Sequence, residues 1–192
     1  MVEFYSYKNN KADISPLILA INTLGENLTG LELGVSTANS TITILHNCSI
    51  KKLYAIDNWK PHYDYLMKVV KDGFSFFIDK KQSEINRFLA FHNIKYSGCK
   101  EKIEVIEEDS IVGINKIKNN SLDFIFFDAM MTEEQTYREA KAIYPKIKKG
   151  GYFTGHDANC VKQVMEPIKK IMKENNNNNK LFDYDNCFLF KC

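Results

Sequence analysis

Short apolar runs alternate along this chain with longer segments whose apolar residues recur at helical spacing. The runs at 28–33, 53–57, 103–106, 122–128 and 152–155 predict strands, and 181–184 with 187–191 predicts a terminal hairpin around Asp185-Asn186. Helices are predicted at 15–24, at 111–117, at 133–147 and at 161–174, and another runs from the turn after the first strand to about 46. The stretch 59–95 is helical in character. This alternation predicts an α/β fold with a mostly parallel sheet and helices on both faces.

Two of the helix boundaries carry capping signals. Ser15-Pro16 predicts an N-cap followed by proline at the first helical position. Lys148-Lys149-Gly150-Gly151 predicts the end of the helix that starts at 133, because lysine suits the helix dipole and glycine the C-cap.

Composition narrows the class of protein. With 192 residues, of which 44% are hydrophobic, the chain suits a single domain spanning 1–192. Its 26 basic and 24 acidic residues leave a net charge of +2, which disfavours nucleic acid as a partner. No apolar run approaches the ~20 residues of a membrane span, and the N-terminus lacks the pattern of a signal peptide. The 5 dispersed cysteines contain no CxxC pair, so we expect reduced thiols and a cytoplasmic location.

Acidic residues stand at the ends of successive predicted strands. These ends read Glu32-Leu33-Gly34, Asp57-Asn58-Trp59, Glu108-Asp109-Ser110, Asp128-Ala129 and His156-Asp157. In open α/β sheets, ligands bind at the carboxyl ends of the central strands. These residues are therefore the candidates for a binding site.

The turn after the first strand reads Glu32-Leu33-Gly34-Val35-Ser36-Thr37-Ala38-Asn39-Ser40-Thr41. With the acidic strand ends that follow, the chain resembles the class I S-adenosylmethionine-dependent methyltransferases, most closely the small O-methyltransferases of the sugar and antibiotic-tailoring type. The resemblance runs from about Leu31 to Asp157. It implies a Rossmann-like fold with a seven-stranded sheet and a C-terminal antiparallel hairpin. The chain departs from the family pattern at Ala38, where a second glycine is usual.

The resemblance implies S-adenosylmethionine as cofactor. Glu32 would fix the motif turn, Asp57 would accept from the ribose hydroxyls, and Asp109 would accept from the adenine amino group. The implied cofactor-binding residues are Glu32, Gly34, Val35, Ser36, Ser40, Thr41, Asp57, Asn58, Trp59, Asp109, Ser110 and Asp128. Simpler interpretations remain open: an ordinary strand–helix turn after Gly34, a polar turn around Trp59, and capping of the helix at 111–117 by Asp109 or Ser110.

The position of Asp57 also fits a nicotinamide cofactor, because a carboxylate there can hold either ribose. A dinucleotide needs a glycine-rich turn for its pyrophosphate, whereas this turn has only Gly34. S-adenosylmethionine carries no phosphate. The sequence thus favours the methyl donor and leaves an oxidoreductase as a weaker alternative.

Two of the acidic strand ends indicate a metal site. Asp128 and Asp157 match the carboxylates of metal-dependent relatives, and Mg²⁺ prefers such oxygen ligands. Ala158 replaces the third ligand found in those relatives, and Met131 stands where many of them have histidine. His156 is then the remaining candidate general base, with Asp128 as the second catalytic candidate. A hydrogen-bonded structural histidine is the alternative interpretation of His156.

We therefore predict a methyltransferase that acts on a small-molecule hydroxyl, such as that of a sugar, with a divalent metal assisting. The stretch 59–95 lies where relatives insert a lid over the acceptor. At helical spacing, its aromatic residues are more often part of a core or a homodimer interface, and we favour that interpretation for each of them except Trp59. The alternative function is a catalytically silent S-adenosylmethionine-binding module or partner subunit, because Met131 and Ala158 depart from the active pattern.

Overall fold

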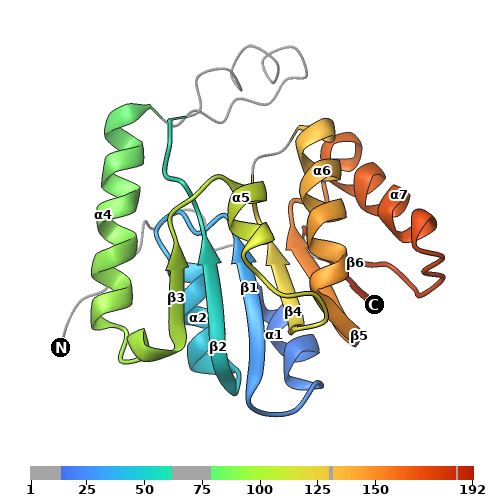
Figure 1. The fold of residues 1–192 in the computed structure, drawn as a ribbon, viewed down its shortest axis with the longest axis horizontal. Helices are drawn as coiled ribbons and strands as arrows, with labels where there is room; N and C mark the ends of the chain where they lie inside the picture. The colour runs from blue at the N-terminus through green and yellow to red at the C-terminus, as the bar shows by residue number, and fades with distance from the viewer. Residues whose placement is uncertain (1–13, 62–78, 130–131, 185) are drawn as a thin grey trace.

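The computed structural model describes residues 14–61, 79–129, 132–184 and 186–192, and at its centre lies a seven-stranded sheet (Figure 1). The strands are β1 (Leu28–Leu33), β2 (Ile50–Ile56), β3 (Ile103–Ile106), β4 (Leu122–Phe127), β5 (Ile147–His156), β6 (Phe182–Tyr184) and β7 (Cys187–Lys191). Their order across the sheet is β3-β2-β1-β4-β5-β7-β6. The strands from β3 to β5 pair in parallel, and β7 is antiparallel to both β5 and β6. The predicted sheet and its terminal hairpin are confirmed.

Helices cover both faces of the sheet. One face carries α1 (Ser15–Asn22), α2 (Asn39–Asn47) and α4 (Lys80–Tyr96); the other carries α5 (Ser110–Asn115), α6 (Glu133–Ile143) and α7 (Glu166–Glu174). Short 3₁₀ turns lie at Lys100–Lys102 and Tyr144–Lys146, and a π-helical turn at Val161–Met165 leads into α7. Among the described residues, no helix is long and apolar enough to cross a membrane.

The core follows from the alternation of side chains along each strand. In β4, Phe124 and Phe126 pack with α1 and α2, whereas Ile125 and Phe127 pack with α5, α6 and α7. All four side chains are at most 1% exposed. An unbroken apolar run is therefore what a central strand between two helical layers requires.

Two predicted helix boundaries are wrong. Ser15 is the first residue of α1, and Ile14 occupies the N-cap position. The helix that starts at Glu133 ends at Ile143, because Pro145 lacks the N–H that would continue it and restricts the residue before it. The segment 148–151 belongs to β5, where it forms an irregularity: Leu122 of β4 pairs with Ile147, but Phe124 pairs with Tyr152.

The parallel strands end in register, which assembles the candidate site. Leu33 pairs with both Ile56 and Phe127, and Phe127 in turn pairs with Gly155. The residues that follow these positions therefore lie along one edge of the sheet, at the top in Figure 1. Residues 62–78 of the predicted lid fall outside the described residues, and its described part consists of a non-helical stretch around Trp59 and of most of α4.

Candidate cofactor site and acidic cluster

The turn after β1 requires glycine at its first position. Gly34 has φ +88°, and its amide donates to the Ile56 carbonyl at 3.0 Å. A Cβ at Gly34 would overlap the backbone carbonyl oxygen of Asp128. Ala38 is also left-handed, with φ +64°, and is fully buried. The family preference for a second glycine thus has a local cause: Ala38 holds a conformation that a Cβ disfavours.

Glu32 fastens this turn to the helix that follows it. Its side chain is fully buried and accepts hydrogen bonds from the hydroxyls of Ser40 and Thr41, at the start of α2. Burial raises the pKa of Glu32 to about 8; the two hydroxyls oppose this rise, and the charges of Asp128 and Asp57 add to it. The structure thus brings together the predicted cofactor residues Glu32, Ser40 and Thr41, but through contacts with one another.

Glu32→Gln tests this account of the turn. An unfolded glutamate ionises near pH 4.5, whereas folded Glu32 keeps its proton up to about pH 8. The wild-type free energy of unfolding should therefore fall with rising pH across this interval, with Glu32 contributing up to about 1.4 kcal/mol per pH unit. Urea titrations at several pH values should show a shallower decline in Glu32→Gln. Identical slopes in both proteins would contradict the assigned pKa.

Asp57 holds the same turn from the next strand. One carboxylate oxygen accepts from the amides of Val35 and Ser36, each at 2.9 Å, and the other accepts from the amide of Trp59 at 2.8 Å. A carboxylate offers about four acceptor positions, so part of its capacity is left for a ribose hydroxyl. The geometry gives Asp57 a structural role beside the predicted one.

Trp59 faces into the protein. Its side chain is 8% exposed, and its indole N–H donates to the carbonyl of Ser36 at 2.7 Å. The ring packs in a cluster with Val35, Ala38 and Ile94. Trp59 therefore supports the motif turn as a core residue, the role that the sequence favoured for the other aromatic residues of 59–95, and its predicted contact with the cofactor stays a prediction.

A row of polar side chains on the inner side of α4, not predicted from the sequence, contacts the motif turn. Asn93 donates to the carbonyl of Thr37 at 2.9 Å, Asn86 donates to the hydroxyl of Ser36, and the Ser83 hydroxyl donates to the Trp59 carbonyl. These three side chains are at most 9% exposed. Small polar residues recurring at helical spacing were the available signal, and they tie α4 directly to the motif turn.

The predicted adenine region lies beyond β3. Asp109 accepts from the Asn58 amide at 2.7 Å and pairs with Lys60 at 3.2 Å; these contacts hold its pKa below the ordinary range. Asp109 occupies the N-cap position of α5, but its side chain makes no cap hydrogen bond. Ser110 accepts from Gln135 of α6 at 3.2 Å. Asn58 and Asp109, predicted at two different strand ends, are in direct contact.

The acidic cluster lies across β4 and β5. His156 Nδ1 lies 3.1 Å from Asp157 Oδ1 and 3.9 Å from Asp128 Oδ1. Ligand-type atoms of all three side chains lie within 4.8 Å of one another. Asp157 has φ +62°, which turns the chain back toward the strand end. The register of β4 with β5 thus unites the predicted metal and catalytic residues.

Proton affinity in this cluster is perturbed. Burial raises the pKa of Asp128 to about 7, and the like charge of Asp157 adds to the rise, while His156 opposes it. The hydrogen bond with Asp157 raises the pKa of His156, and Asp128 adds to this effect. Two carboxylates this close cannot both be charged without a counter-charge, which His156 supplies when protonated.

Asn186, in the hairpin between β6 and β7, was also missed. Its side-chain amide donates to Asp157 Oδ1 at 3.2 Å and lies 3.5 Å from His156 Nε2, and its Oδ1 accepts from the Asn159 amide at 2.9 Å. The Asn186 carbonyl accepts from the Ala158 amide at 3.0 Å. The sequence showed only a turn residue here; the contact exists because β7 pairs beside β5.

The strand order, the glycine turn between β1 and β2 and the acidic strand ends define a class I methyltransferase. A family model described as a methyltransferase domain matches residues 29–158, so the chain belongs to this family. It is an S-adenosylmethionine-dependent methyltransferase. Family membership thus bears out the predicted class and favours the methyl donor over the nicotinamide alternative. No curated protein matches the chain.

Solved structures share the fold at low sequence identity. A Staphylococcus aureus protein provisionally described as a caffeoyl-CoA O-methyltransferase has a TM-score of 0.67 and 12% identity, covering 95% of this chain and 83% of its own. A Streptococcus mutans methyltransferase, also provisionally described and solved with SAH, has a TM-score of 0.61 and 14% identity, with coverages of 92% and 97%. A Clostridium thermocellum protein provisionally described as an rRNA-methylase has a TM-score of 0.65 and 10% identity, with coverages of 93% and 97%.

Proposed function

We propose that this methyltransferase transfers the methyl group to a small-molecule hydroxyl, with a divalent cation held at the acidic cluster. The main support for this proposal is the cluster of Asp128, His156 and Asp157, which lies at the sheet edge beside the Gly34 turn. A small-molecule acceptor also agrees with the near-neutral net charge of +2, and a cytoplasmic location with the 5 dispersed cysteines. The solved structures of this fold include an O-methyltransferase and an rRNA-methylase by description, so the acceptor class rests on the cluster and the charge.

The residues of the cluster fit a cation. Asp128 and Asp157 supply oxygen donors, and the like charge of Asp157 adds to the rise in the pKa of Asp128 that burial causes. These oxygen donors suit Mn²⁺ as well as the predicted Mg²⁺, and they leave the imidazole of the neighbouring His156 to take up a proton. When bound, such a cation supplies Lewis acidity, which lowers the pKa of an acceptor hydroxyl.

His156 is the proposed proton acceptor of the chain. With Nδ1–H donating to Asp157, the imidazole carries its lone pair on Nε2, which faces Asn186. Asp157 would stabilise the imidazolium formed when a hydroxyl proton arrives, and Asn186 fixes the orientation of Asp157. The remaining task is alignment of the acceptor oxygen with the methyl group, which the rigid strand ends favour.

Calorimetry separates this function from the silent-module alternative. We expect saturable 1:1 binding of S-adenosylhomocysteine, with no comparable binding of NADH. We also expect S-adenosylhomocysteine to accumulate when S-adenosylmethionine is mixed with a panel of small hydroxyl compounds and Mn²⁺ or Mg²⁺. EDTA and Asp157→Ala should each suppress turnover. Cofactor binding without turnover or metal binding would support the silent module instead.

A further inference from the structure

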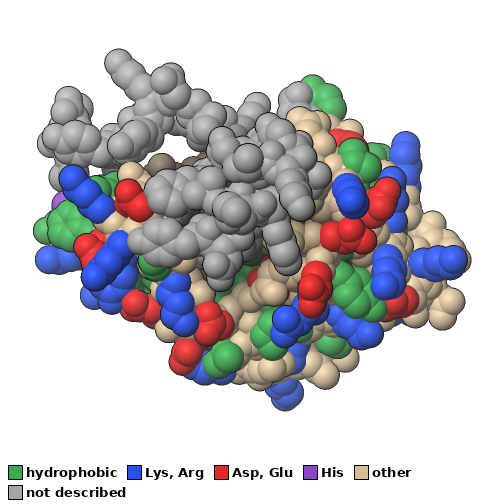
Figure 2. All heavy atoms as spheres, turned by 90° about the horizontal axis from the view of Figure 1, so that it is seen from above, with side chains coloured by type: hydrophobic (Ala, Val, Ile, Leu, Met, Phe, Trp, Pro, Cys, Tyr) green, Lys and Arg blue, Asp and Glu red, His purple; other side chains and the backbone are tan. Residues whose placement is uncertain are grey.

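The outward side of α4 carries an unusual set of exposed side chains. Phe88 is 68% exposed and Tyr96 49% exposed, and His92 lies between them with ring centroids 6.1 and 4.7 Å away. A surface groove runs along this helix; we call its lining the α4 face, which comprises Glu84, Arg87, Phe88, Phe91, His92, Lys95 and Tyr96. In Figure 2, hydrophobic, histidine and basic side chains gather at the left edge, on the side where Figure 1 places α4.

The face is turned away from the inner side of the same helix, except that the Phe91 ring also lies 5.6 Å from the ring of Trp59. Ser83, Asn86, Ala90 and Ile94 are buried against the sheet and the motif turn. The exposed residues recur at intervals of three and four, from Glu84 through Phe88 to Lys95. This is the spacing of a helix that packs along a second helix. Because the outer side of α4 has the same spacing as its buried inner side, we expect the outer side to be covered as well.

We propose that the α4 face binds the α4 face of a second copy of this chain, with the two helices antiparallel. Glu84 lies near the beginning of the helix and Lys95 near its end, about 16 Å apart along the axis. A two-fold axis midway between Phe88 and Phe91 places Glu84 against the partner's Lys95, and Phe88 against the partner's Phe91. Two-fold symmetry makes each contact twice, so a pair of Glu84 and Lys95 from different copies lies at each end of the aromatic centre.

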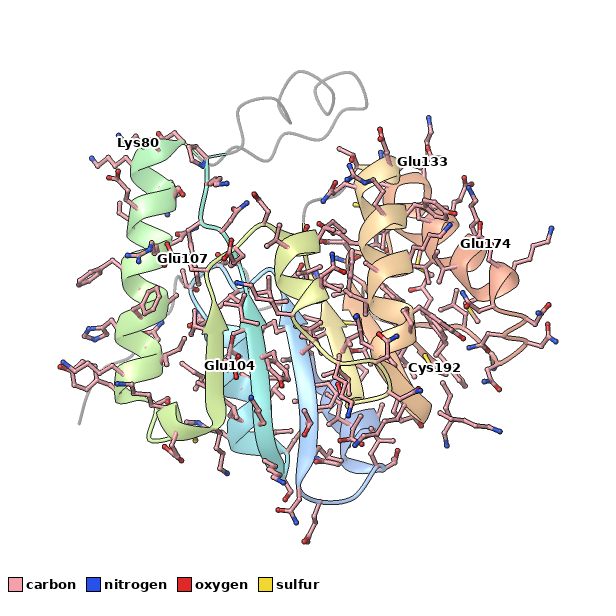
Figure 3. All side chains as sticks on the ribbon, viewed as in Figure 1. Lys80, Glu104, Glu107, Glu133, Glu174 and Cys192 are labelled. Atoms are coloured by element: carbon pink, nitrogen blue, oxygen red, sulfur yellow. The ribbon has the colours of Figure 1, made fainter. Side chains whose placement is uncertain are left out.

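The opposite charges of Glu84 and Lys95 at the two ends of the face favour this occupant over an acidic one. Within the chain, Glu84 lies 4.0 Å from Lys80, an exposed pair of the kind that contributes little to stability. Arg87 is already engaged: it binds Glu107, labelled in Figure 3, through two nitrogens at 2.7 Å and lies over the Phe91 ring at 4.8 Å. A parallel pair of helices would set Glu84 against Glu84 and Lys95 against Lys95. Only the antiparallel arrangement makes the face complementary to itself, which an acidic nucleic acid would not exploit.

Dimerisation here would reinforce the cofactor turn. The inner side of α4 donates hydrogen bonds to Thr37 and Trp59, so a partner that holds the outer side restricts the helix that holds the turn. The proposal does not depend on the acceptor or on a metal. It concerns the described residues of α4 alone.

A charge-swap experiment tests the proposal. Sedimentation equilibrium on the full chain should give a dimer, and Glu84→Lys and Lys95→Glu should each raise the dimer dissociation constant by about tenfold or more. The double variant, which restores the opposite-charge pair, should recover near wild-type dimerisation. Phe88→Ser should weaken the dimer further, and Lys118→Glu, an exposed charge reversal outside α4, should leave it unchanged.

Circular dichroism of each variant controls for folding. A monomeric wild-type chain, or a double variant no better than the single ones, would overturn the proposal. Crosslinks between Lys95 and Lys8 or Lys11 of the same chain would assign the face to the N-terminal segment, which also overturns it. Retention of an RNA by the wild-type face, lost in Phe88→Ser, would do so as well.

Discussion

Asp128→Asn is expected to lower methyl transfer by about 100-fold or more while making the protein more stable. The change keeps the size of the side chain but removes one carboxylate from the cluster with His156 and Asp157. The change would remove one of the two proposed metal donors and the charge beside the proposed base His156, and general acid–base catalysis alone is typically worth about 10²–10⁴ in rate. Because the backbone of residue 128, which borders the Gly34 turn, is unchanged, S-adenosylhomocysteine should still bind.

The expected gain in stability follows from the raised pKa of Asp128 in the folded protein. The pKa of Asp128 is raised from 3.8 to about 7, so the folded state favours the proton that the unfolded chain releases. Stability is therefore lost as pH rises from about 4 to 7, and above that range the folded protein carries an unfavourable charge. In EDTA at pH 8, urea titration of Asp128→Asn should show a free energy of unfolding higher by on the order of 2 kcal/mol.

Exposed Asp183 in β6 provides the matched control, because Asp183→Asn makes the same chemical change away from the site. It should alter neither turnover nor stability. Turnover in Asp128→Asn within about threefold of wild type would remove Asp128 from the proposed chemistry. A stability loss in that variant would instead show that Asp128 is balanced by contacts beyond His156.

Most of the architecture could be predicted from the sequence because the spacing of apolar residues within each element is a local property. Unbroken apolar runs marked the central strands, and acids at their ends had to share one edge once those strands paired in parallel. This reasoning correctly grouped Asp128 with His156 and Asp157. It also placed the hairpin after the last helix.

What remained hidden depends on packing between distant segments. Asn186 reaches Asp157 only because β7 inserts beside β5, and no periodicity reports the partner of a turn residue. Asn93 likewise supports the motif turn from a helix more than fifty residues further along the chain. The predicted end of α6 is wrong for a different reason: it rested on the lysine and glycine signals at 148–151, whereas Pro145, which lies before them, ends the helix.

The turn after β1 leads to the second large expectation, that Gly34→Ala disables cofactor binding and destabilises the fold by about 3–5 kcal/mol. Two costs combine at this position. The backbone is left-handed, with φ +88°, and the added Cβ would overlap the Asp128 carbonyl oxygen, which is backbone and cannot move aside cheaply. Any relief of this overlap separates β1 from β4 at the point where the turn begins.

Gly25 and Gly150 allow the two costs to be measured separately. Both have similar backbone angles, with φ +98° and +85°, but a Cβ at Gly25 meets nothing within 4 Å and one at Gly150 lies 3.8 Å from the end of Lys191. Gly25→Ala and Gly150→Ala should therefore cost only the conformational part, about 1 kcal/mol each. Urea titration gives the three free energies, and calorimetry with S-adenosylhomocysteine should detect binding in both controls but not in Gly34→Ala. Equal costs at all three positions would show that the turn yields to the methyl group, and that Gly34 is needed for its backbone angle alone.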